Sequence, residues 1–235
     1  KPDMKTFKQY IDGRWVEPSN GKSTEVLNPS TDEVVGMVAN GDEKDAVLAL
    51  EAAERAKVGW GRMPARKRAE LLYALCDEVR KNREEIATVL TQEQGKLFKV
   101  AKFEVDVFCS FVEYACEFAR RIEGDIIPSD NENEQIWIQK IPRGVVVRIT
   151  AWNFPLALAG RKIGPALVAG NTMVVKPTTE TPMSTLMLGD LAKKAGIPDG
   201  VLNILTGPGR TMGDALVRHP ITKMVSMTGS TPAGQ

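Results

Sequence analysis

The sequence contains little that could hold a metal ion, bind nucleic acid or cross a membrane. Its 235 residues include one histidine and three cysteines. No two cysteines form a Cys-x-x-Cys pair, so no recognisable metal-ligand spacing is present. The net charge is only +1, which argues against nucleic acid or an anionic membrane surface as the main partner. No apolar run approaches the roughly 18 residues that indicate a transmembrane helix.

Cysteine usage and the first residues bear on the cellular compartment. Cys76, Cys109 and Cys116 are odd in number and lie in helical apolar patterns, which is typical of reduced thiols in a core rather than of disulfides. The first ten residues, KPDMKTFKQY, lack the apolar core of a signal peptide. The sequence therefore predicts a cytoplasmic protein, long enough for one large domain or two small ones.

The first half of the chain predicts short strands followed by helices. Asp12-Gly13, between FKQYI and RWVE, is a strong hairpin signal. Asp42 suits the N-cap of a helix, and Gly95 suits the end of a later one. Apolar residues at helical spacing then predict one long helix from Leu97 to Gly124.

Strands and helices alternate from Gly144 onward. The apolar runs VVVRITA, TMVVK, VLNIL and KMVSMT are separated by helical segments. This pattern predicts an α/β fold with a Rossmann-like parallel sheet and helices on both faces. We expect three segments: an N-terminal hairpin and helices of the cofactor domain (1–124), an extended arm (125–143), and a Rossmann-like core that is C-terminally incomplete (144–235). The alternating run IWIQKI in the arm favours subunit contacts as much as an ordinary edge strand.

Three strand ends carry groups that suit a phosphate or a ribose. The segment 207–213, GPGRTMG, approaches the fingerprint G-x-G-x-x-G, but its last glycine comes one residue late, and a tight turn fits equally well. Thr228-Gly229-Ser230 offers either an anion site or a plain helix cap. Lys176 ends a buried strand, where a solvated lysine is the simpler interpretation. Ligands bind beyond the carboxyl ends of parallel strands, so together the three ends favour a dinucleotide site as much as three unrelated turns.

A second set of polar residues follows the first of these strands. Asn153, in AWNFP, has a side-chain donor that could stabilise an oxyanion or simply form a turn. Arg161 and Lys162 interrupt the apolar stretch LALAGRKIGPALVAG, where burying a charge is costly. One interpretation is that both side chains extend to the surface. The alternative for Arg161 is that its guanidinium binds a carboxylate through two nitrogens.

Together these motifs resemble one enzyme family. WNFP, GPALVAGNTMVVKP, GPGRTMG and TGS, in this order and spacing, resemble the N-terminal half of aldehyde dehydrogenases, most nearly the lactaldehyde or glycolaldehyde and the succinate-semialdehyde dehydrogenases. The resemblance implies an enzyme that oxidises small aldehydes bearing a hydroxyl or a carboxylate to acids. It implies NAD or NADP as cofactor and a cysteine thiohemiacetal and thioester as intermediates. With the exposed arm, we also expect a homo-oligomer, either a dimer or a tetramer.

The resemblance assigns roles residue by residue. Asn153 matches the amide of the oxyanion hole, and Lys162 matches a lysine that relays a proton or supports the structure. Phe154 would line the substrate tunnel, and Arg161 matches an arginine that binds substrate carboxylates. The residues implied in cofactor binding are Ile149, Thr150, Ala151, Trp152, Lys176, Thr178, Thr179, Gly209, Arg210, Gly213, Gly229 and Ser230.

Two departures from the family pattern bear on the cofactor site. Ala151 stands where the family usually has proline, which loosens the turn slightly. Thr179 stands where the family commonly has a glutamate that binds the ribose hydroxyls and repels a 2′-phosphate. With Arg210 nearby, Thr179 predicts that NADP is used at least as well as NAD. Glu180, one residue later, could swing back and restore the repulsion.

The third departure concerns the chemistry. In the family, the nucleophilic cysteine and the general-base glutamate come later than Gln235, and the three cysteines of this chain match no nucleophile position. We therefore expect a fragment that is inactive alone. The alternative is a catalytically inactive nucleotide-binding fragment or structural partner that assembles with a separate C-terminal chain. A hydrolase fits poorly, because G-x-S-x-G is absent and His219 is the one histidine.

Overall fold

The main sheet of the computed structural model has six strands in the order β11-β8-β9-β10-β2-β3. The structure describes residues 5–234; residues 1–4 and Gln235, at the outer ends of the first and third expected segments, lie outside it. Four strands run parallel: β8 (Val145–Ile149), β9 (Thr172–Lys176), β10 (Leu202–Ile204) and β11 (Thr222–Met227). This parallel arrangement confirms the predicted Rossmann-like fold class.

The N-terminal hairpin joins the same sheet. β2 (Gln9–Ile11) pairs with β3 (Arg14–Val16), and Asp12 and Gly13 both have positive φ (53° and 72°), as a two-residue type I′ turn requires. The hairpin prediction is confirmed. β2 also pairs antiparallel with β10, which makes the sheet mixed. The strands β1 (Lys5–Phe7), β4 (Ser23–Leu27) and β5 (Val34–Ala39) form a separate three-stranded sheet.

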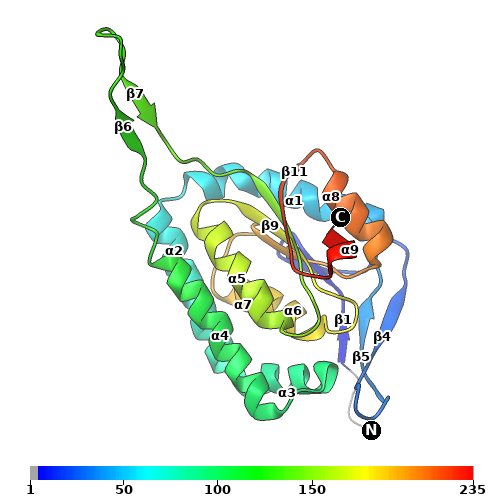
Figure 1. Ribbon diagram of the computed structural model, residues 1–235. Coiled ribbons are helices and arrows are strands. Elements are labelled where there is room, and N and C mark those ends of the chain that lie inside the picture. Colours follow the sequence, from blue (N-terminus) through cyan, green and yellow to red (C-terminus); the bar gives the residue numbers. More distant parts are fainter. Residues whose placement is uncertain (1–4, 235) are drawn as a thin grey trace.

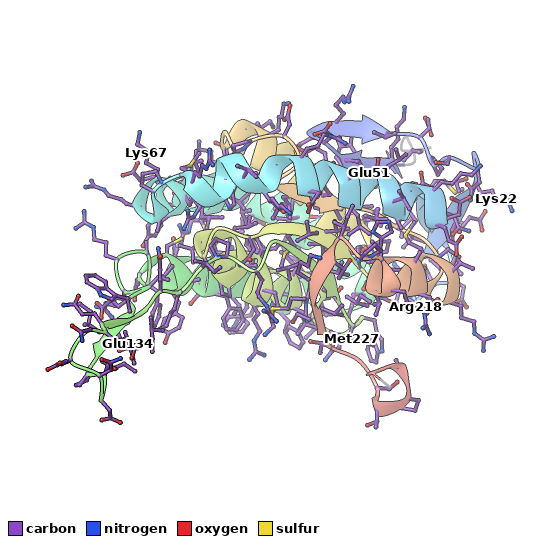
Figure 2. All side chains as sticks on the ribbon, turned by 90° about the horizontal axis from the view of Figure 1, so that it is seen from above. Lys22, Glu51, Lys67, Glu134, Arg218 and Met227 are labelled. Carbon is purple, nitrogen blue, oxygen red and sulfur yellow. The ribbon has the colours of Figure 1, made fainter. Side chains whose placement is uncertain are left out.

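Helices cover both faces of the main sheet, and Figure 2 shows α1 lying along one of them. Val145, Val147 and Val174 pack with α1 (Glu43–Arg62) and α8 (Asp214–Arg218), whereas Val146 and Met173 pack with the helices opposite. The remaining helices are α2 (Ala65–Lys81), α3 (Arg83–Gln94), α4 (Phe98–Cys116), α5 (Pro155–Val168), α6 (Met183–Leu186), α7 (Leu188–Lys194), the π-helical turn η1 (Gly209–Gly213) and α9 (Thr231–Gly234). None of the helices within residues 5–234 is long and apolar enough to span a bilayer.

The predicted helix caps are present, but one helix is shorter than predicted. Asp42 accepts a hydrogen bond at the start of α1, and Gly95 ends α3 with φ of 80°. The periodicity predicts helix as far as Gly124, but α4 ends at Cys116. Residues 117–124 are mostly exposed, so a longer helix would bury too little apolar surface to offset its conformational entropy.

A two-stranded hairpin projects from the body of the protein (Figure 1). β6 (Asp125–Ile127) pairs antiparallel with β7 (Ile136–Ile138), and within residues 5–234 neither pairs with a third strand. Ile126 and Trp137 are 68% and 69% exposed. An isolated hairpin is marginally stable in water, so these apolar side chains call for a covering surface.

Candidate cofactor and substrate site

The carboxyl ends of three parallel strands lie level with one another. Ile149 of β8 is in register with Lys176 of β9 and with Met227 of β11. Beyond these ends lies a cavity of about 1100 Å³, large for a small-molecule site. Its walls include the cofactor candidates Ile149, Lys176, Gly209, Arg210, Gly213 and Ser230. The other cofactor candidates, Thr150, Ala151, Trp152, Thr178, Thr179 and Gly229, follow the same strands without lining the cavity.

Lys176 is the buried cation of the cavity wall. The residue is 4% exposed, and its ammonium donates one long hydrogen bond, 3.4 Å to the carbonyl oxygen of Pro177. Burial lowers the pKa of Lys176 to about 8, although the charge of Glu180 acts in the opposite direction. An ammonium has three N–H donors, so this one retains donors for a hydroxyl or phosphate oxygen of a ligand.

Positive charge exceeds negative charge around Lys176. Arg210 is exposed on the cavity wall, and no ion pair joins it to an acidic group within the described residues, whereas Arg218 pairs with Asp214 at 2.6 Å. Glu180 accepts a hydrogen bond from the hydroxyl of Thr178. Burial opposes ionisation of Glu180, but hydrogen bonds and the charge of Lys176 prevail and lower its pKa. The remaining excess of positive charge suits a phosphorylated ligand.

The apolar strand β8 contains a buried cation, Arg148, which periodicity does not mark as functional. Its guanidinium donates to the carbonyl and hydroxyl oxygens of Ser226 (3.1 and 3.3 Å) and to the hydroxyl of Thr228 (2.7 Å). Burial and the charge of Arg161 lower the pKa of Arg148 to about 10, so it is charged at neutral pH. Arg148 therefore ties the end of β11, just before Gly229, to β8. The one signal in the sequence is a charge inside an apolar run.

The residues suggested for catalysis and substrate binding form a second, exposed group at α5. Asn153 and Phe154 lie in the turn before this helix, and Arg161 and Lys162 lie on it. None of the four lines the cavity. The guanidinium of Arg161 lies 5.1 Å from the centre of the Phe111 ring, a cation–π contact with α4. The structure thus brings six of the cofactor candidates together around the cavity, and these four residues lie outside its wall.

Two buried glutamates hold the beginnings of helices next to this group. Glu104 of α4 accepts from the N–H groups of Leu156 and Ala157 in the first turn of α5 (2.9 and 3.1 Å). Glu93 of α3 accepts from N–H groups at the start of α6. Burial raises the pKa of Glu93 to about 7. Each glutamate belongs to a different helix from the one it caps, so no local capping motif reveals it.

Within the described residues, the cysteines and potential metal ligands form no centre of their own. Cys76, Cys109 and Cys116 are free thiols buried in α2 and α4, and none lines the cavity. Among residues 5–234, no group of three or more His, Cys, Asp or Glu side chains is arranged to hold a metal ion.

A mainly parallel sheet covered on both faces, with a cavity beyond level strand ends, defines the class of ligand-binding doubly wound α/β folds. Residues 15–235 match the model of the aldehyde dehydrogenase family, and the chain belongs to that family. The predicted resemblance is confirmed. The chain spans about half the length of the curated relatives it matches.

Relatives and solved structures agree with this assignment. The chain is 62% identical to 3,6-anhydro-alpha-L-galactose dehydrogenase of Vibrio sp. (strain EJY3), over 99% of this chain and 48% of the relative. It is 39% identical to lactaldehyde dehydrogenase of Escherichia coli, over 96% and 47%. A solved structure of 3,6-anhydro-L-galactose dehydrogenase superposes with a TM-score of 0.96 at 57% identity, over 98% of this chain and 48% of that one.

Two further matches name a cofactor. D-glyceraldehyde dehydrogenase (NADP(+)) of Thermoplasma acidophilum is 38% identical over 97% of this chain and 46% of the relative. Betaine aldehyde dehydrogenase of Staphylococcus aureus, solved in complex with NAD⁺, has a TM-score of 0.93 at 34% identity, over 97% of this chain and 46% of that one.

Proposed function

We propose that the protein containing this chain is an NAD(P)-dependent aldehyde dehydrogenase and that this chain supplies its cofactor site. The observation that carries the proposal is the cavity at the level strand ends, where buried Lys176 retains free donors. The bound cofactor supplies the oxidant for the aldehyde. Lys176 binds a ribose hydroxyl. The residues that orient the rest of the cofactor are Ile149, Thr150, Ala151, Trp152, Thr178, Gly209, Gly213, Gly229 and Ser230.

NADP is used at least as well as NAD in this proposal. Thr179 carries no charge to repel a 2′-phosphate, and Arg210 is exposed on the cavity wall without an ion pair in the described part of the chain. Glu180 opposes this preference, because it is ionised and close enough to act on Lys176. A relative that is named for NADP(+) supports the same choice.

The proposed substrates are small aldehydes that bear a hydroxyl or a carboxylate, such as lactaldehyde, glycolaldehyde or succinate semialdehyde. Arg161 binds the anionic or hydroxyl end of the substrate, and Phe154 lines its path. The side-chain amide of Asn153 donates to the oxygen of the tetrahedral adduct, where an oriented donor stabilises developing charge. Lys162 relays a proton or supports this geometry.

The nucleophilic cysteine and basic glutamate of the proposed reaction are assigned to no residue here. The three cysteines are buried in α2 and α4 and do not line the cavity, which supports a nucleophile outside this chain. On this view the chain alone is inactive in aldehyde oxidation. Unpaired, buried thiols also support a cytoplasmic location.

The projecting hairpin β6–β7 is proposed to join subunits of a dimer or tetramer. Its exposed Ile126 and Trp137 offer apolar side chains, and its strands have free edges within the described residues. Pairing with a neighbouring subunit would cover both.

Calorimetric titration of this chain with NADP and with NAD tests the cofactor site directly. We expect both to bind, Lys176→Met to weaken binding by about ten-fold, the loss of one charged hydrogen bond, and Lys67→Met, an exposed lysine on α2, to leave it unchanged. The complete protein should then oxidise the named aldehydes. Cofactor binding without any aldehyde oxidation would instead favour a nucleotide-binding partner, and absence of binding would refute the proposal.

A further inference from the structure

Lys96 lies between α3 and α4, outside every motif of the sequence, yet it contacts the turn that carries Asn153. Its Nζ donates a 2.9 Å hydrogen bond to the carbonyl oxygen of Asn153 and lies 4.0 Å from the centre of the Phe154 ring. The same ammonium is paired with Glu104. The side chains of Lys96 and Glu104 are 8% and 0% exposed, so this is a buried ion pair beneath an exposed turn.

Glu104 extends these contacts to the far side of the turn. Its second carboxylate oxygen accepts from the N–H groups of Leu156 and Ala157. The N-cap residue of α5, Phe154, makes no side-chain capping bond, so Glu104 satisfies N–H groups that the helix itself leaves free. The ion pair therefore holds the backbone that directly follows the Asn153 side chain, from the carbonyl of Asn153 to the first turn of α5.

Burying the Lys96–Glu104 ion pair costs desolvation free energy, which indicates that the pair has a role other than stabilising the fold. Two charges withdrawn from water lose solvation that their attraction only partly restores, and an apolar pair of similar size is often as stable. In the described residues, every polar contact of the Lys96 ammonium ends on Asn153 or on Glu104. Packing of α4 on α5 alone would not require an ammonium at this place.

We propose that Lys96, acting with Glu104, is a positioning residue that sets the direction of the Asn153 side-chain amide. The inference rests on the proposed function, in which that amide donates to the reacting oxygen. The bond to the Asn153 carbonyl and the contact with the Phe154 ring hold the peptide plane between the two residues, which restricts the ψ angle of Asn153 and thereby the direction of its side chain. A displacement of about 1 Å at such a donor costs roughly 100-fold in rate.

The test compares Lys96→Met and Lys96→Arg with a matched control in the complete protein. Lys102 on α4 also pairs with a carboxylate (Glu84, 3.4 Å) and lies 4.9 Å from the centre of a ring (Phe98), but it does not contact the Asn153 turn. We expect Lys96→Met to lower kcat by about 10- to 100-fold with the KM for the cofactor unchanged. Lys96→Arg should retain most activity, and Lys102→Met should behave as the unaltered protein.

A double-mutant cycle separates positioning from general support. If Lys96 acts through the Asn153 amide, Lys96→Met should lower kcat no further once Asn153→Ala has removed that amide. Equal losses in the presence and absence of Asn153 would overturn the proposal. So would a loss in Lys102→Met as large as that in Lys96→Met.

Amide hydrogen exchange of this chain tests whether Lys96 holds the Asn153 turn, and it requires no measurement of enzyme activity. Lys96→Met should speed exchange of the amides in residues 152–158, and Lys102→Met should not. If the unaltered complete protein oxidises no aldehyde, the proposed function fails, and faster exchange still supports the positioning of the turn. Unchanged exchange in Lys96→Met rejects the positioning role, whatever the protein catalyses.

Discussion

The guanidinium of Arg148, on β8, donates a 2.7 Å hydrogen bond to the hydroxyl of Thr228, the residue that follows β11. Two further bonds from the same guanidinium reach Ser226. Its Nε lacks a hydrogen-bond partner, and no acidic group within residues 5–234 forms an ion pair with it. A buried cation in these surroundings weakens the folded state, so its value lies in what it positions, the turn at Gly229 beside the cavity.

Replacing Arg148 should therefore separate stability from cofactor binding. Arg148→Met removes an unpaired buried charge, and we expect the free energy of unfolding in urea to stay the same or rise. The same variant releases the end of β11, and we expect the Kd for NADP to rise about ten-fold, the worth of one or two hydrogen bonds. Arg148→Lys keeps the charge without the forked geometry and should bind NADP with intermediate affinity. Unchanged affinity in Arg148→Met would contradict the positioning of the turn.

Cofactor binding should depend on pH through Lys176. Its pKa of about 8 leaves the ammonium charged below pH 8 and neutral above it. The charged form donates to and attracts the cofactor, so affinity should be constant below about pH 7 and fall above pH 8 by about ten-fold in total, the contribution of the ammonium. Titration calorimetry from pH 6 to pH 9.5 measures this. NAD is the better probe, since it has no 2′-phosphate that titrates. Lys176→Arg stays charged throughout, and a decline of the same steepness in that variant would exclude Lys176 as the titrating group.

Cofactor choice should respond to charge at position 179. Thr179→Glu places a carboxylate beside the proposed site of the 2′-phosphate. We expect kcat/KM for NADP to fall about ten-fold or more relative to that for NAD, the effect of one unscreened repulsion at a partly exposed site. Gln92, exposed on α3 and outside the cavity wall, provides the control. An equal shift in Gln92→Glu would mean that overall charge, and not position 179, sets the preference.

Local sequence patterns predict the helices, strands and turns of this fold better than they predict which of these elements pair or pack together. Asp12-Gly13 dictates a tight hairpin because both residues accept positive φ, but nothing in it specifies that β2 will pair with β10. The apolar periodicity predicts a helix that continues past Cys116, because a local pattern does not show that the following residues have no surface to pack against. Lys176 and Ser230 were predictable as neighbours because parallel strand ends converge. Lys96 was not, because its contacts with Asn153 join residues 57 positions apart.

Glu93 should make the stability of the fold depend on pH. Its folded pKa of about 7 exceeds the ordinary value of 4.5, chiefly through burial, with Glu104 adding to the effect. The neutral acid is the form that suits the core, so its contribution is complete below pH 4.5 and is lost as the pH rises through 7. The free energy of unfolding of the unaltered chain should therefore fall relative to that of Glu93→Gln as the pH rises, by up to about 3 kcal/mol across that window. Urea unfolding at intervals from pH 4.5 to pH 8 measures it. Glu85→Gln, exposed on the same helix, should show no such trend.

Arg161 should discriminate between aldehydes by their charge. In the proposed function its guanidinium binds a substrate carboxylate, and the Phe111 ring 5.1 Å away holds it in place. Arg161→Leu in the complete protein removes a charged hydrogen bond worth about 2–3 kcal/mol, so the KM for succinate semialdehyde should rise far more than the KM for propanal. Phe111→Leu keeps the guanidinium but removes the ring, and it should raise the KM for succinate semialdehyde by a smaller factor. If Arg161→Leu affects both aldehydes equally, the arginine does not bind the carboxylate. The cation–π contact with Phe111 would then be its main interaction, and Phe111→Leu would leave the discrimination between the two aldehydes unchanged.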